Sequence, residues 1–343
     1  MKINNFKNRL TALALCFTLL LGAAPITRAY AVNDESDTSS SQSDSDSSDT
    51  SSTDSGSTDS ADSKDSKDVT ADNDKDVTAA ASEAPAVTAT AALLISPDSD
   101  MVLYEKNADE KRYPASTTKI MTALLTLENV KDLNETVTAE QGDFAKVTAD
   151  SSNADIKVGE TVRVIDLLYA LLVCSANDAA SVIAWDVAGS IPAFVQQMNA
   201  RAEQLGCTST RFSCPHGLYD DGNVSTAQDM GKIAIACAQY EIYRQIADTL
   251  QYEIPATNLH AARSIRSTNK MLDPENSCYR AYIHGMKTGF TTKAGRCYVT
   301  AAQQGDTIYG LVILGSDRKN IYAEAAAILD WAFAGCPQQQ AAA

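Results

Sequence analysis

A long stretch without hydrophobic side chains sets the tightest limit on what this chain can fold into. Between residues 33 and 68 the only hydrophobic residue is Ala61, and almost all the others are Ser, Asp or Thr. Such a segment cannot bury enough apolar surface to offset its conformational entropy, so it stays unfolded. We therefore predict a disordered acidic linker at residues 32–88, a folded domain at residues 89–336 and a disordered tail at residues 337–343.

The first 31 residues have the order of features that is typical of a secretory signal peptide. A basic start without acidic residues precedes the apolar run 10–24 and then Ala29-Tyr30-Ala31, where small residues suit a signal peptidase. The apolar run is short for a membrane span of about 20 residues, and an uncleaved anchor is the alternative. Bulky Leu15 before Cys16 argues against lipidation. We expect a signal peptide at residues 1–31 and a secreted, extracytoplasmic protein, membrane-tethered if the signal is kept.

Much of the negative charge lies in the predicted linker. Residues 33–84 hold fifteen acidic residues against three lysines, whereas residues 85–343 carry a net charge of only −8 out of −16 for the whole chain. The predicted domain has no basic field, which argues against nucleic acid as a partner.

Seven cysteines follow the predicted signal peptide, and their spacings match no zinc-binding pattern. The odd number leaves at least one of them unpaired in a monomer. Cys207 and Cys214 are close enough in sequence for a local disulfide, which the sequence alone does not establish. We interpret most of the seven as separate buried thiols.

Hydrophobic periodicity predicts strands at both ends of the domain and helices between them. This order predicts an α+β fold, in which an antiparallel sheet built from both ends of the domain is flanked by helices and carries a helix-rich lobe. The predicted strands are 91–95, 101–104, 282–288, 297–303 and 307–314, and the predicted helices are 116–128, 165–173, 178–187, 194–204 and 317–333.

Three short motifs follow one another along the domain: Ser116-Thr117-Thr118-Lys119, Ser175-Ala176-Asn177 and Lys287-Thr288-Gly289. Each motif alone is weak, but the three in this order, each on the expected kind of element, are typical of penicillin-binding proteins and class A β-lactamases. The domain is therefore predicted to have the fold of the β-lactamases and penicillin-binding transpeptidases.

The first motif suits a serine nucleophile with a lysine base. A serine hydroxyl needs a neighbouring group to take its proton, and three positions along a helix put Lys119 on the same face as Ser116. A lysine acts as a base only when its pKa is lowered, which burial and a second cation such as Lys287 both achieve. The alternative is an incidental serine and lysine on a surface helix.

The other two motifs suit proton relay and substrate binding. Ser175 in a loop can relay a proton and Asn177 can bind a peptide carbonyl. The alternative is that either residue caps the following helix. Lys287 and Thr288 at a strand end can bind a carboxylate, and Gly289 lets another backbone pass close. An ordinary exit from the strand is the alternative for this third motif.

The sequence around these motifs resembles the low-molecular-mass penicillin-binding proteins that are serine-type D-alanyl-D-alanine carboxypeptidases. The resemblance spans residues 90–335 and is carried by residues 104–107, 113–123, 175–180, 194–199, 215–218, 225–227, 287–291 and 294–295.

The resemblance implies hydrolysis of the terminal D-Ala-D-Ala bond of a peptidoglycan stem pentapeptide. Ser116 would attack the carbonyl, Lys119 would act as base, and Ser175 would return a proton to the leaving D-alanine. The backbone N–H groups of Ser116 and Phe290 would form the oxyanion hole, where loss of one donor costs about 100- to 1,000-fold in rate. Neither a metal nor an organic cofactor is implied, and β-lactam antibiotics would acylate the serine.

The resemblance also implies how the substrate is held. Asn177 would position it, and Lys287 and Thr288 would hold its terminal carboxylate, next to Gly289. Many relatives add a β-rich domain and a C-terminal amphipathic membrane anchor. The chain ends at Ala343, soon after the last predicted helix, so we expect neither feature here.

Other functions share some of these features. A class A β-lactamase would add a loop glutamate for deacylation, but Glu203 and Glu241 are interpreted as helix-surface residues. A transpeptidase differs only in its acceptor, and a non-catalytic wall-binding protein would not need the intact motifs. A Ser/His mechanism is the rival chemistry. No histidine has the sequence context it needs, and we interpret all three, His216, His260 and His284, as structural.

Overall fold

The computed structural model describes residues 83–99, 101–144, 147–148 and 150–336. The predicted signal peptide, most of the predicted linker and the predicted tail at residues 337–343 lie outside the described residues.

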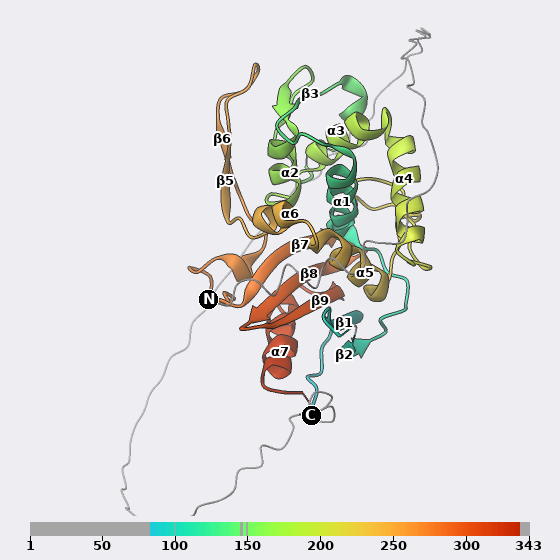
Figure 1. Ribbon diagram of the computed structural model, residues 1–343, viewed down its shortest axis with the longest axis vertical. Helices are drawn as coiled ribbons and strands as arrows, with labels where there is room; N and C mark the ends of the chain where they lie inside the picture. Colours follow the sequence, from blue (N-terminus) through green and yellow to red (C-terminus); the bar gives the residue numbers. More distant parts are fainter. Residues whose placement is uncertain (1–82, 100, 145–146, 149, 337–343) are drawn as a thin grey trace, which may run out of the picture. The chain divides into compact units, whose positions relative to one another are not determined.

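A five-stranded antiparallel sheet forms the centre of the described domain (Figure 1). Its strand order is β2-β1-β9-β8-β7, so strands from both ends of the domain lie side by side, as predicted. The strands are β1 (Ala91–Ser96), β2 (Met101–Lys106), β7 (Ile283–Thr291), β8 (Gly295–Gln304) and β9 (Thr307–Ser316).

The central strands are apolar on both faces because both faces of the sheet are covered. Along β1, Leu93 belongs to the core beneath the helical lobe and Leu94 to the core on the opposite face. On the paired strand β9, Val312 and Ile313 divide in the same way. This alternation is why both strands read as continuous hydrophobic runs in the sequence.

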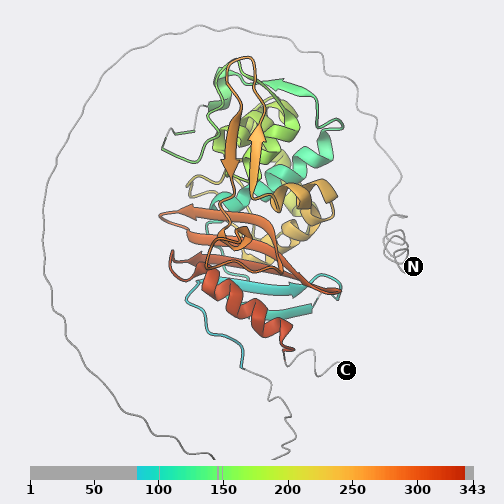
Figure 2. The ribbon, with the colours of Figure 1, turned by 90° about the vertical axis from the view of Figure 1, so that its left-hand side faces the viewer.

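Helix α7 covers one face of the sheet, and the other helices form a lobe on the opposite face (Figure 2). Within the lobe, α5 packs directly against β1 and β9, while α1, α2, α3 and α4 pack on one another. The helices are α1 (Lys119–Asn129), α2 (Val164–Leu172), α3 (Asn177–Ala188), α4 (Ile191–Gln204), α5 (Ala227–Ala238), α6 (Glu241–Ala247) and α7 (Ile321–Phe333).

Two short two-stranded antiparallel sheets accompany the lobe. They are β3 (Thr136–Thr138) with β4 (Thr161–Arg163), and β5 (Gln251–Ile254) with β6 (Arg263–Arg266). The sequence analysis did not predict these small sheets, α5 or α6, so the lobe is larger than expected.

The predicted fold class is confirmed, and the predicted strands and helices agree with the structure apart from their ends. The helix predicted from Ser116 begins instead with a 3₁₀ turn, η1 (Ala115–Thr118), and becomes α-helical at Lys119. The closing helix begins at Ile321 rather than Asp317, because the Asp317 carboxylate accepts the N–H groups of Lys319 and Asn320 at 2.7 and 2.9 Å and forms a turn first.

Among the described residues, no single helix has the length and apolar character that a membrane crossing requires. Only α3 and α4 reach these values when taken together, and they meet at a bend of 85°. The seven cysteines of the described part are all free thiols, five of them buried, as interpreted from their spacing.

Candidate active site

Ser116 and Lys119 lie one turn apart where η1 joins α1. The Lys119 Nζ atom is 3.2 Å from Ser116 Oγ. Lys119 is completely buried, whereas Ser116 is partly exposed. The spacing of the first motif therefore produces the contact that was predicted from helical geometry, with the hydroxyl accessible and the amine beneath it.

Two oxygen acceptors hold the Lys119 amine from the other side. Asn177 Oδ1 and the backbone carbonyl of His216 each lie 2.6 Å from Lys119 Nζ. Burial lowers the pKa of Lys119 well below its usual value, and the nearby Lys287 ammonium lowers it further. A neutral amine has two N–H groups and one lone pair. With both N–H groups given to Asn177 and His216, the lone pair is left for Ser116.

The second motif forms the turn that leads into α3. Asn177 is the first residue of this helix, and Ala176 is its N-cap without any side-chain hydrogen bond. The capping alternative for Ser175 and Asn177 therefore does not apply. Ser175 is buried, has a positive φ of 64° and makes no hydrogen bond within the described part of the chain. A positive φ is strained for a serine, and such strain is typical of functional sites.

The third motif lies on the edge strand β7, directly beside Ser116. A Cβ atom at Gly289 would lie only 2.9 Å from the backbone nitrogen of Ser116, so the glycine allows the close approach that was predicted for it. Lys287 is buried, and its Nζ donates to the Thr288 carbonyl at 2.8 Å. Burial lowers the pKa of Lys287 to about 7.

Phe290 follows the motif at the rim of the sheet. Its ring is about half exposed. The Arg296 guanidinium on the neighbouring strand β8 lies 4.5 Å from the ring centroid, in a cation–π contact. This contact holds the Phe290 ring against the neighbouring strand.

A loop from a third part of the chain closes the site behind the serine. A Cβ atom at Gly217 would lie 2.0 Å from the carbonyl oxygen of Ala115, and Gly217 has a φ of +82°. Thr122 in α1 donates to the carbonyl of Pro215 at 2.6 Å. These contacts place the His216 carbonyl on Lys119 and keep Ala115 in its strained conformation, with a φ of 49°.

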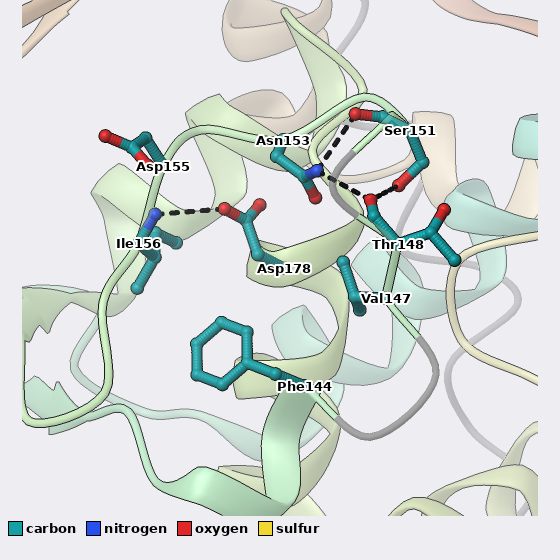
Figure 3. A pocket seen from close by; sticks show the side chains of 8 residues that line it. All are labelled: Phe144, Val147, Thr148, Ser151, Asn153, Asp155, Ile156 and Asp178. Atoms are coloured by element: carbon teal, nitrogen blue, oxygen red, sulfur yellow. Dashed lines mark hydrogen bonds between the residues drawn. The ribbon is translucent and has the colours of Figure 1, made fainter. Parts of the chain in front are cut away.

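A pocket of about 450 Å³ lies beside the second motif, with Asp178 in its wall (Figure 3). The buried Asp178 carboxylate accepts the backbone N–H groups of Ala154 and Ile156, each at 3.0 Å. The N–H of Asn177 donates to the Ser152 carbonyl at 2.8 Å. Asp178 thus holds the loop around residues 152–156, and the Ser152 carbonyl of this loop holds the backbone of Asn177. Burial raises the pKa of this carboxyl, and the N–H groups oppose that shift.

The remaining titratable residues of the sequence analysis lie in structural positions. The His216 Nδ1 atom accepts the N–H of Leu218 at 3.1 Å, and His284 pairs with Asp248 at 2.9 Å. Glu203 and Glu241 are exposed on helices. Within the described ranges, no group of three or more His, Cys, Asp or Glu residues is placed to hold a metal ion.

The fold is that of the penicillin-binding proteins and DD-peptidases. The Streptomyces K15 DD-transpeptidase superposes with a TM-score of 0.68 and 29% sequence identity, over 74% of this chain and 100% of that chain. The chain belongs to the D-alanyl-D-alanine carboxypeptidase family, whose profile matches residues 78–318.

Two relatives of similar sequence identity are named for different peptidase activities. D-alanyl-D-alanine carboxypeptidase DacF of Bacillus subtilis is 32% identical over 251 residues, which are 71% of this chain and 62% of the relative. The D-alanyl-D-alanine endopeptidase of Escherichia coli is 30% identical over 257 residues, which are 74% of this chain and 81% of the relative. The chain therefore spans a little over three fifths of the length of the carboxypeptidase DacF.

Some residues of the site were not predicted from the sequence. The backbone carbonyl of His216 contacts Lys119, and Gly217 makes that contact possible. The only signal for them was the stretch Pro215–Leu218, which contributes to the family resemblance. The Thr268 hydroxyl, 2.5 Å from that of Thr288, had no sequence signal.

Proposed function

We propose that the protein is a serine-type D-Ala-D-Ala carboxypeptidase that acts on peptidoglycan stem pentapeptides through an acyl-enzyme on Ser116. The observation that supports this most is the completely buried Lys119 amine, 3.2 Å from Ser116 Oγ and held by two oxygen acceptors. Membership of the carboxypeptidase family supports the same conclusion.

In the acylation step, Lys119 takes the Ser116 proton as the serine oxygen attacks the carbonyl between the two terminal D-alanines. A Ser116–acyl bond forms, and the C–N bond to the last D-alanine breaks. The N–H groups of Ser116 and Phe290 stabilise the oxyanion. The proton that Lys119 took from Ser116 passes through the Ser175 hydroxyl to the leaving amine, which leaves Lys119 neutral again. The positive φ of Ser175 supports a functional role for this residue.

In the second step, water attacks the acyl-enzyme while Lys119 again takes a proton. The ester bond breaks, Ser116 regains its proton, and the shortened stem peptide leaves. Asn177 fixes Lys119 through its Oδ1 atom, and the two N–H groups of its amide are free to face a substrate carbonyl. Its role is then both to position the base and to bind the peptide.

The Lys287 ammonium and the Thr288 hydroxyl bind the terminal carboxylate of the substrate, next to Gly289. A β-lactam antibiotic carries a carboxylate and a reactive carbonyl in a similar arrangement, so it acylates Ser116 as well. Because the substrate belongs to the cell wall, we place the protein outside the cytoplasm, in agreement with the signal peptide predicted at residues 1–31.

The experiment that tests this function combines labelling with product analysis. Fluorescent penicillin is expected to label the protein, and Ser116→Ala is expected to abolish labelling. Incubation with a stem pentapeptide is expected to release free D-alanine from the native protein only. Labelling that persists in the alanine variant would identify a different nucleophile.

Transpeptidation is a second candidate, because the whole length of the Streptomyces K15 DD-transpeptidase superposes on this chain. The two activities differ only in whether water or an amine accepts the acyl group. Addition of a second peptide with a free amine separates them: a cross-linked product at the expense of hydrolysis would favour transpeptidation. Rapid turnover of penicillin would instead favour a β-lactamase.

A further inference from the structure

Thr268 joins three parts of the molecule that meet at the cleft. It lies between β6 and the turn η3 (Lys270–Leu272). Its N–H donates to the carbonyl of Val173, two residues before Ser175, at 3.0 Å. Its carbonyl accepts the hydroxyl of Tyr322, at the start of α7, at 3.2 Å. Two backbone bonds therefore fix the position of Thr268 without using its side chain.

The Thr268 side chain points to the third motif. Its Oγ1 lies 2.5 Å from Thr288 Oγ1, and either hydroxyl can be the donor. Thr268 is exposed and Thr288 partly exposed, so a ligand can reach this pair. The buried Lys287 amine lies on the same strand and donates to the Thr288 carbonyl. The two hydroxyls thus meet at the edge of β7, and the buried Lys287 precedes Thr288 on the same strand.

The pair has a direct consequence for anion binding. A single hydroxyl rotates and has one proton to donate. When Thr268 donates to Thr288 Oγ1, the Thr288 proton must point elsewhere, towards an acceptor outside the pair. Hydrogen bonds in such a chain also strengthen one another. The Thr288 hydroxyl is then preset to donate to a negatively charged oxygen.

We propose that Thr268 is a positioning residue, which orients the Thr288 hydroxyl for the terminal carboxylate of the substrate. This inference rests on the proposed function, since it assumes that Lys287 and Thr288 hold a carboxylate. Thr268 adds selectivity for a charged chain end, because a neutral amide gains less from the same donor than a carboxylate does.

Thr268→Val tests the hydroxyl alone. Valine has nearly the same shape, and the backbone bonds to Val173 and Tyr322 remain. The expected result is a roughly 3- to 10-fold rise in KM for a stem pentapeptide ending in D-Ala-D-Ala, the effect of losing one hydrogen bond. The kcat is expected to change less than twofold. Thr268→Ser, which restores a hydroxyl, is expected to restore KM.

A matched control uses another pair of threonines. Thr161 Oγ1 lies 3.0 Å from Thr138 Oγ1 across the β3–β4 pair, also on the surface. Thr161→Val removes the same kind of hydroxyl contact outside the site, and KM is expected to stay unchanged. Thermal unfolding of all variants checks that each one is folded.

The decisive comparison uses the same pentapeptide with its terminal carboxylate converted to an amide. Thr268→Val is expected to leave the KM of the amide peptide unchanged. If turnover of the amide peptide is too slow to measure, its Ki as a competitor of labelling by fluorescent penicillin is measured instead and is also expected to stay unchanged. Equal losses for the acid and the amide, a loss in kcat alone, or no loss at all would overturn the role of Thr268. If the native protein neither releases D-alanine nor binds penicillin, the proposed function itself fails.

Discussion

Each side of the cleft has a buried lysine, but the surroundings of the two amines differ. On the helical side, Lys119 is buried among oxygen acceptors and faces a second ammonium group. On the sheet side, Lys287 is also buried, and its ammonium is one of the groups that lower the pKa of Lys119. Burial is the main cause that lowers the pKa of both amines, and the charge of Lys287 lowers that of Lys119 further. Lys119 is thereby suited to accept a proton and Lys287 to remain a cation up to about pH 7.

The largest expected effect comes from removing the amine on the helical side. Lys119→Met keeps the length of the side chain but removes the base. General-base catalysis typically contributes about 100- to 10,000-fold, and we expect a loss of this size in the second-order rate of labelling by fluorescent penicillin. Lys287→Met should mainly raise KM for carboxylate substrates. If both variants lost the same property, the two lysines would not have separate roles.

The glycines on the two sides offer a second, smaller contrast. Gly217→Ala adds a Cβ only 2.0 Å from the Ala115 carbonyl at a φ of +82°. We expect a loss of about 2 kcal/mol or more, which would lower Tm by roughly 4–8 °C. Gly289→Ala, with a contact of 2.9 Å to Ser116 N, should lower labelling more than stability.

The control for this contrast is Gly189, which has a similar φ of +73° but no atom within 4 Å of the added Cβ. Gly189→Ala measures the cost of the backbone conformation alone, about 1 kcal/mol. If the Gly217→Ala protein were as stable as the Gly189→Ala protein, the loop behind Ser116 would move enough to relieve the contact with Ala115, and the predicted extra loss of stability would be wrong.

The pH profile gives the smallest expected effect, a loss of about tenfold one pH unit above the pKa of Lys287. Since the pKa of Lys287 is lowered to about 7, the free protein loses its carboxylate-binding charge as the pH rises through that value. The kcat/KM for a stem pentapeptide should fall above about pH 7. In the complex, the bound carboxylate raises the pKa of Lys287, so kcat should persist to higher pH. A kcat/KM that stays level between pH 6 and 9 would contradict this order of titration.

The fold and the site could be predicted from the sequence where they depend on the type and the spacing of side chains. The contact between Ser116 and Lys119 follows from helical geometry, and a sheet built from both ends of the domain follows from the apolar runs found there. The contacts of the His216 carbonyl and of Thr268 were not predictable in this way. Every residue has a backbone carbonyl, so the residue type does not reveal which carbonyl contacts Lys119. Thr268 lies 20 residues from its partner Thr288, in a turn without hydrophobic periodicity.

The way in which the ends of the domain meet in the sheet also determines when the protein can become active. Strand β1 pairs with β9, as in Leu93 with Val312, and the nucleophile lies about 170 residues before the strand that completes its cleft. Closing such a long loop is slow compared with forming local helices. Until β7 joins the sheet, Ser116 and Lys119 have no strand beside them. If the proposed function holds, acylation of Ser116 requires that the C-terminal strands have folded first.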